Sequence, residues 1–249
     1  MINTAQEGGT RQGLDVLRQF ARRPRPNAEH CEMCASELHR EHPHLIELTQ
    51  RKLLCACEAC AMLFSSRSDS TPPFLKIGDV SVIGHGKPAP RAARYKRVPR
   101  DVRFLANFHM SDAAWDGLLI PINLAFFFRK SALPSGPDSC VSAFYPSPAG
   151  ATESLLPLEA WNSIVQTNPI LSALEPDVEA LLVNRVGAAR GATAPEYYIV
   201  PIDACYKLVG LIRMHWRGLS GGTEVWQEIG AFFSQLRGRA EVVGEEIHA

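Results

Sequence analysis

The sequence predicts an α+β fold in two parts, and three observations carry that prediction. The chain of 249 residues suits one or two domains. Five of its seven cysteines lie within the thirty residues from Cys31 to Cys60. Beyond them, short apolar runs and amphipathic stretches mix without the regular long crossovers of a parallel sheet. We therefore expect a small cysteine-bearing module, followed by a mixed, mostly antiparallel sheet domain with helices.

Composition excludes several classes of protein. Hydrophobic residues make up 46% of the chain and charged residues 21%, which is enough apolar material for a core and argues against a disordered protein. The longest apolar run without charge, residues 118–128, contains Pro121 and falls short of the roughly 20 residues of a membrane-spanning helix. No apolar signal segment is visible near the N-terminus. We expect a cytoplasmic protein without a membrane span.

The net charge is zero, but its distribution is uneven. Residues 1–110 carry 17 Lys/Arg against 11 Asp/Glu, whereas residues 111–249 carry 9 against 15. The two halves could contact each other or two different partners. The basic stretch 91–103 could also follow a phosphate backbone. No aromatic-interleaved binding motif accompanies this stretch, so the sequence favours a solvated face and does not favour nucleic acid as a partner.

The cysteine cluster contains the motif C-E-x-C-A twice, at residues 31–35 and 57–61. A C-x-x-C turn lets two thiolates reach the same ion, and two such turns complete a tetrahedral shell of four sulfurs. The odd cysteine count disfavours a disulfide framework. Zinc suits four thiolates, which leave no open position for water. We therefore predict a structural zinc ribbon over residues 28–66, whose metal ligands are Cys31, Cys34, Cys57 and Cys60.

Three alternatives at this module stay open. Cys55 lacks the repeated spacing and is expected to be a small core residue. The four histidines are expected on the ribbon surface, although one of them could replace a cysteine in a Cys3His shell. Iron in a rubredoxin-like site is the rival to zinc, but such turns generally place glycine after the second cysteine, where this chain has Ala35 and Ala61. The histidines are His30, His39, His42 and His44.

The remaining chain divides into further segments. Residues 1–27 form an N-terminal helix and tail with a helix over 13–23, residues 67–94 a linker, and residues 241–249 a C-terminal tail. The linker includes a strand-like piece at 74–83. Within the domain at 95–240, the patterns predict strands at 120–128, 140–145, 178–184 and 197–200, and helices at 158–166, 203–214 with Asp203 as N-cap, and 223–239. Pro157 is expected in the first turn of the helix at 158–166.

Three groups of residues in this domain are candidates for ligand binding, each weighed against an ordinary structural role. The loop 145–154 is small, polar and able to hold an anion with backbone N–H groups. The pair at 184–185 could clamp a carboxylate or phosphate. The polar and aromatic set over 203–217 could form an enzyme pocket with the loop, with His215 as base. No paired nucleophile accompanies it. The candidates are Ser147, Gly150, Thr152, Asn184, Arg185, Asp203, Tyr206, Arg213 and His215.

The blocks C-E-M-C, L-L-C-A-C-E-A-C-A-M-L-F, A-F-F-F-R, F-Y-P-S-P-A-G-A-T-E-S-L-L, L-E-P-D-V-E-A-L-L-V-N-R and I-V-P-I-D-A-C-Y-K-L-V-G-L-I-R-M-H-W-R-G together identify a resemblance. Over roughly residues 14–240 the chain resembles an uncharacterised bacterial family, a domain of unknown function. Genes of that family lie beside those of actinobacterial-type, high-affinity nickel–iron hydrogenases. The resemblance implies that the four cysteines bind metal and that 145–154 and 203–217 are characteristic blocks. It assigns no catalytic role.

Together these observations favour a non-enzymatic metal-binding accessory protein. The resemblance implies a role in assembling, maturing or accompanying the hydrogenase, with its subunits or maturation factors as protein partners. An iron electron carrier of the same system is the alternative. An enzyme using the 145–154 and 203–217 segments is a third hypothesis.

Overall fold

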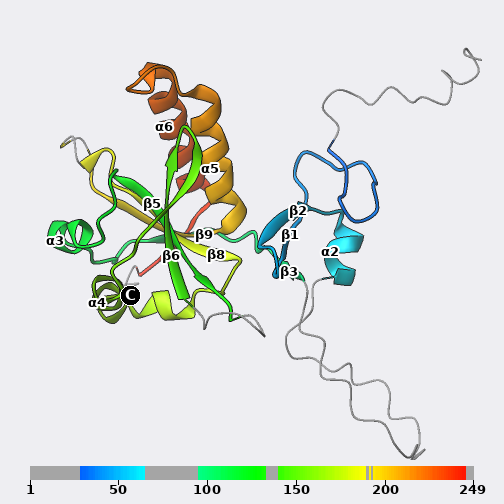
Figure 1. Cartoon of the computed structure of the whole chain (residues 1–249), viewed down its shortest axis with the longest axis horizontal. Helices are drawn as coiled ribbons and strands as arrows, with labels where there is room; N and C mark the ends of the chain where they lie inside the picture. The colour runs from blue at the N-terminus through cyan, green and yellow to red at the C-terminus, as the bar shows by residue number, and fades with distance from the viewer. Residues whose placement is uncertain (1–28, 65–94, 133–139, 189–190, 192, 245–249) are drawn as a thin grey trace, which may run out of the picture.

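The computed structural model describes residues 29–64, 95–132, 140–188, 191 and 193–244, which form a small and a large lobe side by side (Figure 1). The predicted helix at 13–23 and the strand-like piece at 74–83 lie outside the described residues. Within the described parts of the chain, no helix has the length and apolar character needed to cross a membrane. Helix and sheet are mixed, and all but one of the strand pairings are antiparallel, which confirms the predicted α+β class.

The small lobe is a three-stranded antiparallel sheet with one short helix. Its sheet has the order β2-β1-β3. The predicted start of the second domain at residue 95 therefore falls on a strand that completes the ribbon sheet. The elements are β1 (His44–Glu47), β2 (Lys52–Cys55), α2 (Glu58–Phe64) and β3 (Tyr95–Arg97).

The large lobe is built on a seven-stranded sheet of order β10-β4-β9-β8-β5-β6-β7, in which only β10 and β4 are parallel. Its long central strands carry nearly continuous apolar runs because both faces of the sheet are covered. The strands are β4 (Arg103–Leu105), β5 (Leu124–Lys130), β6 (Cys140–Ser147), β7 (Gly150–Ser154), β8 (Glu179–Asn184), β9 (Glu196–Pro201) and β10 (Glu241–Val243).

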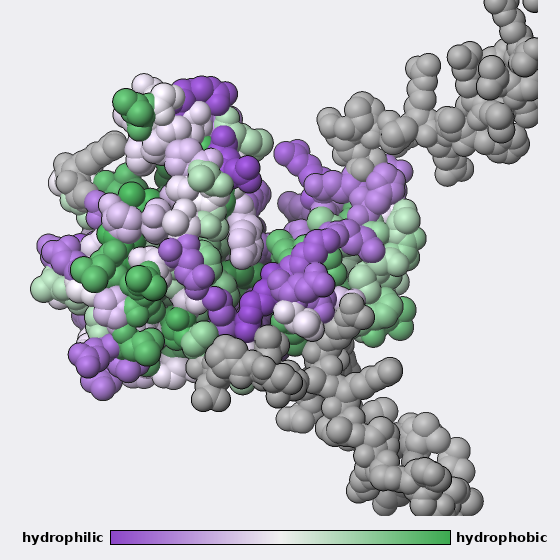
Figure 2. All heavy atoms as spheres, viewed as in Figure 1, coloured by the Kyte–Doolittle hydropathy of each residue, from purple (hydrophilic) through white to green (hydrophobic). Residues whose placement is uncertain are grey.

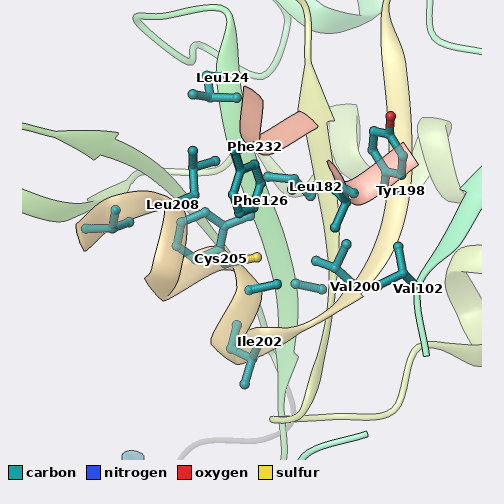
Figure 3. Close-up of a cluster of buried hydrophobic side chains, with 14 of the residues drawn as sticks. Val102, Leu124, Phe126, Leu182, Tyr198, Val200, Ile202, Cys205, Leu208 and Phe232 are labelled. Carbon is teal, nitrogen blue, oxygen red and sulfur yellow. The ribbon is translucent and has the colours of Figure 1, made fainter. Parts of the chain in front are cut away.

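Two hydrophobic clusters occupy the two faces of this sheet. Along β5, Phe126 and Phe128 join the cluster under α5 and α6, whereas Ala125 and Phe127 join the cluster with α3 and α4. Figure 3 shows Phe126 among the side chains of the first cluster, with Cys205 of α5 beside it. The covering helices are α3 (Asp112–Asp116), α4 (Leu158–Thr167), the 3₁₀ turn η1 (Pro169–Ala173), α5 (Ile202–His215) and α6 (Gly222–Arg239).

Most predicted elements of this lobe are present, with shifted ends. Helix α5 begins at Ile202 after Pro201, so Asp203 lies in its first turn and is not the N-cap. Pro157 likewise precedes α4 as its N-cap. Residues 145–154, predicted as a loop, form the β6–β7 hairpin, because Ser147 pairs with Gly150 across a two-residue turn. Strands β4 and β10 and helix α3 are too short to give a periodic signal in the sequence, which is why they were not predicted.

The small lobe is docked on the large one by apolar and charged contacts. Ile46 of β1 and Val98, just after β3, are buried in the cluster under α5 and α6. Arg51 donates to the Asp177 carboxylate at 2.5 Å, and Lys96 donates to Glu175 at 3.1 Å. Figure 2 shows hydrophilic residues where the two lobes meet. Basic residues of the N-terminal half thus contact acidic residues of the C-terminal half.

Candidate metal centre

The structure brings together the four cysteines of the repeated motif. One ligand atom from each of Cys31, Cys34, Cys57 and Cys60 lies within 4.8 Å of the others. Cys31 and Cys34 come from the turn that precedes β1, whereas Cys57 lies just before α2 and Cys60 lies inside it. Two segments separated by the β1–β2 hairpin therefore supply two sulfurs each.

The distance between the two sulfurs that join the segments fits a tetrahedral ion. Zinc–sulfur bonds of about 2.3 Å place neighbouring sulfurs of a regular tetrahedron about 3.8 Å apart. The Sγ atoms of Cys34 and Cys57, one from each segment, are 3.7 Å apart. Cys31 and Cys60 are buried, and Cys34 is exposed. The arrangement is compatible with an ion that four thiolates enclose at the edge of the lobe.

The two C-E-x-C-A motifs fold differently. In both, the N–H of the alanine donates to the carbonyl of the first cysteine at 2.8 Å, but Ala35 of the first motif has a φ of 60°. In the second, Ala61 lies inside α2 and is fully buried. The first alanine thus adopts the left-handed conformation in which glycine is favoured, and the second position has no need of glycine. The lack of glycine therefore does not separate zinc from iron at this site.

Backbone N–H groups shape the electrostatics of the sulfurs. Burial raises the pKa of Cys31, but N–H groups of Cys57, Met33 and Cys34 outweigh it and lower the pKa to about 6. The N–H of Cys60 donates to Cys57 Sγ at 3.4 Å and lowers the pKa of Cys57. Burial, together with the neighbouring thiols, raises the pKa of Cys60 to about 12. A cation at the centre would favour the thiolate form of all four.

Cys55 lies outside this group, at the end of β2. Burial and the neighbouring carboxylates of Glu29 and Glu32 raise its pKa. The prediction that all four histidines lie on the ribbon surface is wrong for His42, whose side chain is buried, and holds only in part for His44. The His42 side chain is 6% exposed and that of His44 is 23% exposed, whereas His30 and His39 are exposed.

A second group of metal-ligand residues contains these two histidines. A ligand atom of His42, one of His44 and Cys55 Sγ lie within 4.8 Å of one another. Sequence reasoning missed this group, although a usable signal exists. Antiparallel pairing of β1 and β2 sets His44 directly opposite Cys55, and directly opposite residues share one face of a sheet.

The predicted anion loop is a self-contained hairpin. Ser147 Oγ donates to the carbonyl of Gly150 at 3.0 Å and lies 3.1 Å from Thr152 Oγ1. It also accepts from the N–H of Ala149 at 3.2 Å. The polar groups of the turn are therefore engaged with one another, which is the structural role that the sequence left open for this segment.

The pair at 184–185 makes contacts inside the large lobe. Asn184 donates to Glu196 at 2.9 Å. Arg185 is only 6% exposed; it donates to Asp112, and its Cζ lies 5.4 Å from the centre of the Trp115 ring. Arg185 does clamp a carboxylate, but the carboxylate belongs to α3 of the same chain.

The remaining candidates lie on one helix without meeting at one site. Asp203 contacts His44 of the small lobe, and Tyr206 packs edge-on against Phe126. His215, at the other end of α5, pairs with Glu224 at 2.8 Å, and Arg213 is exposed. These positions separate the residues that the sequence placed in one set.

A cavity of about 370 Å³ lies between the 145–154 hairpin and the helices α5 and α6, where the enzyme hypothesis placed a pocket. Its lining is mostly apolar and includes Tyr145, Ile212 and Trp216. Ser147 is the one predicted ligand-binding residue in that lining, and neither Arg213 nor His215 belongs to it. His215 is therefore not placed to act as a base in this cavity.

Comparison with known proteins gives one match. A family model described as "Family of unknown function (DUF5947)" matches residues 30–87 and 85–240, which include all four clustered cysteines. No curated protein and no solved structure matches the chain.

Proposed function

The chain belongs to the DUF5947 family. We propose that it is a metal-binding accessory protein, in which a zinc ion holds the ribbon lobe in its folded shape and this lobe docks to a protein partner. The observation that carries this proposal is the group of four cysteine sulfurs within 4.8 Å of one another. Four thiolates close a tetrahedral shell and leave no position for substrate or water. The ion's role is therefore to hold the lobe in shape.

The small apolar core of the ribbon supports a structural role for the ion. Among the residues that the structure describes, its cluster of buried residues has six members, two of which are the cysteines Cys31 and Cys60. A core of this size contributes little stability by itself, so cross-linking of two segments by metal would supply the rest.

A protein partner is favoured over nucleic acid by the surface of the ribbon. Arg97 donates to Glu58 at 2.5 Å, and Arg100 lies 3.7 Å from the same carboxylate. These cations are therefore not a free stripe for phosphates. On α2, by contrast, Met62 is 62% exposed and Leu63 is 78% exposed. Exposed apolar side chains on a small lobe suit contact with another protein.

The partner we propose is a component of a nickel–iron hydrogenase system, either a subunit or a maturation factor. This part of the proposal rests on the sequence resemblance to a family whose genes lie beside hydrogenase genes.

Elemental analysis of the purified full-length chain tests the metal. We expect at least one zinc per chain, bound through the four cysteines, and one zinc fewer in the variant Cys34→Ser/Cys57→Ser. The variant Cys140→Ser, which removes a cysteine of the large lobe, is the control. Iron in place of zinc, with the visible absorption of a ferric tetrathiolate, would instead support the rubredoxin-like alternative. A folded ribbon without any metal would contradict both.

Affinity capture from the native host tests the partner. The tagged chain should recover hydrogenase subunits or maturation factors, and the variant Met62→Ser/Leu63→Ser should recover several-fold less. The control Leu155→Ser/Leu219→Ser changes two side chains that are also exposed but lie on the large lobe. Equal recovery by both variants would contradict docking through α2.

A further inference from the structure

A second set of ligand atoms lies beside the four-cysteine cluster and shares no residue with it. His42 and His44 stand two residues apart, and Cys55 is the cross-strand partner of His44. The two imidazole rings are 4.8 Å apart between centres, at 55° to each other. Two imidazoles and one thiol thus converge at the face of the ribbon that meets α5.

Hydrogen bonds fix which nitrogen of each ring is free. His42 Nδ1 lies 2.9 Å from the carbonyl oxygen of His39, and His44 Nδ1 lies 2.8 Å from Asp203 Oδ2. A carbonyl or a carboxylate oxygen accepts, so each Nδ1 carries the proton and donates it. The lone pair of each neutral ring is then on Nε2. Metal-binding histidines in proteins are typically held in this way, through a carboxylate or a carbonyl on the other nitrogen.

His42 provides an independent indication of a ligand site. Its side chain is 94% buried, from an exposed fraction of 6%, and its Nε2 has no hydrogen-bond partner among the described residues. A buried acceptor without a partner costs about 1–3 kcal/mol. A cation at this nitrogen would remove that cost.

We propose that His42, His44 and Cys55 form a second metal site, which takes a divalent transition ion such as Zn²⁺ through two Nε2 atoms and one thiolate. Binding forms one metal–sulfur and two metal–nitrogen bonds, and the thiol proton of Cys55 passes to solvent. Three protein ligands leave the fourth position of a tetrahedral ion to water or an outside donor. The ion at this site is exchangeable, unlike one enclosed by four thiolates. Asp203 is its positioning residue and ties the site to the large lobe.

Titration of the metal-free, reduced full-length chain with Co²⁺ tests the proposal. We expect the wild type to bind two equivalents and the variant His42→Ala/Cys55→Ser to bind one. The matched control His39→Ala/Cys140→Ser removes one exposed histidine and one exposed cysteine, keeps the His39 carbonyl, and should bind two. Saturation of the wild type at one equivalent, or two equivalents in His42→Ala/Cys55→Ser, would overturn the second site.

The variant Asp203→Ala probes the orientation of His44. Two equivalents should still bind, but Co²⁺ affinity at the weaker site should fall by about 10- to 100-fold, as for other partners of metal-bound histidines. An unchanged affinity would argue against Asp203 as a positioning residue.

A measurement on the unaltered chain covers the case in which a variant fails to fold. Loaded with ¹¹³Cd²⁺, the wild type should give two resonances, one for four sulfurs and one for a site with a single sulfur. A four-sulfur resonance alone would overturn the second site and leave the proposed function intact. Absence of the four-sulfur resonance would contradict the proposed function instead.

Discussion

The two lobes differ in how much apolar burial stabilises each of them. Among the described residues, the large lobe has two buried clusters of 22 and 15 residues, the first of which includes Ile46 and Val98 from the docked ribbon. The ribbon's own cluster has six. The sheet lobe thus has the apolar burial of a self-sufficient domain, whereas the ribbon's own core is small and, under the proposed function, is supplemented by metal at its cysteines. The comparison teaches that packing alone accounts for the large lobe, whereas the small ribbon core leaves a need that the proposed metal coordination would meet.

Metal removal should produce the largest difference in stability between the two lobes. A structural zinc site contributes about 10–16 kcal/mol of apparent binding free energy, which folding of a small module requires. With a strong chelator, or in Cys31→Ser, residues 29–64 should lose protection in hydrogen exchange while β8 and α6 retain it. The control Cys140→Ser should leave both lobes protected. A ribbon that stays protected without metal would end the distinction between the lobes.

A substitution that creates a cavity in the core of the large lobe should have the opposite effect: it should lower the stability of that lobe and leave the metal bound. Phe126 is 1% exposed at the centre of β5, so Phe126→Ala should cost about 3–5 kcal/mol in the free energy of unfolding. Denaturant unfolding measures this loss, and the metal content per folded chain should stay unchanged. Leu155→Ala, at a side chain that is 94% exposed, is the control and should change the free energy by less than about 0.5 kcal/mol. Loss of metal from the folded chain would mean that the metal site depends on the packing of the large lobe.

The docking contact of Arg51 should have an intermediate effect. Arg51 is 27% exposed and pairs with Asp177, which is 2% exposed. Because Arg51→Ala leaves a buried carboxylate without its cation, we expect a loss of about 1–3 kcal/mol in unfolding free energy. Lys52→Ala breaks the neighbouring pair with Glu32, whose side chains are 58% and 37% exposed, and should cost about 0–1 kcal/mol. Equal losses in the two variants would show that docking gains nothing from the buried pair.

The smallest expected effect concerns the repeated motif. Ala35→Gly relieves a left-handed alanine at a small entropic cost, so metal binding should tighten by about 0.5–1 kcal/mol, or about two- to fivefold. Ala61→Gly, at the matching position inside α2, should weaken binding by about 1 kcal/mol. Competition with a chromophoric chelator measures both. Changes of the same sign would mean that the two motifs fold alike.

The sequence predicted the features that depend on short-range patterns. The C-x-x-C spacing indicated Cys31, Cys34, Cys57 and Cys60, and the structure brings these four together. The 3.6-residue periodicity over 223–239 predicted helix α6, and the buried residues of α6 in the structure are Val225, Ile229, Phe232, Phe233 and Leu236.

Features that depend on distant residues were beyond such patterns. The pairing of His44 with Asp203 joins positions 159 residues apart, and no local spacing signals it. Burial of Arg185 likewise follows from Asp112 and Trp115 on α3, a helix of five residues that carries too little periodicity to detect. The parallel pairing of β10 with β4 depends on where the end of α6 places the chain.

Strand β3 has a consequence for any attempt to divide the protein. It follows residues 65–94 in the chain, yet it pairs with β1, and Val98 next to it is buried among the side chains of the large lobe. A nick anywhere between Phe64 and Tyr95 would therefore leave two fragments that still share one sheet. Cleavage there should yield a non-covalent complex that migrates as one species until denatured, and the ribbon would not be released as a free module.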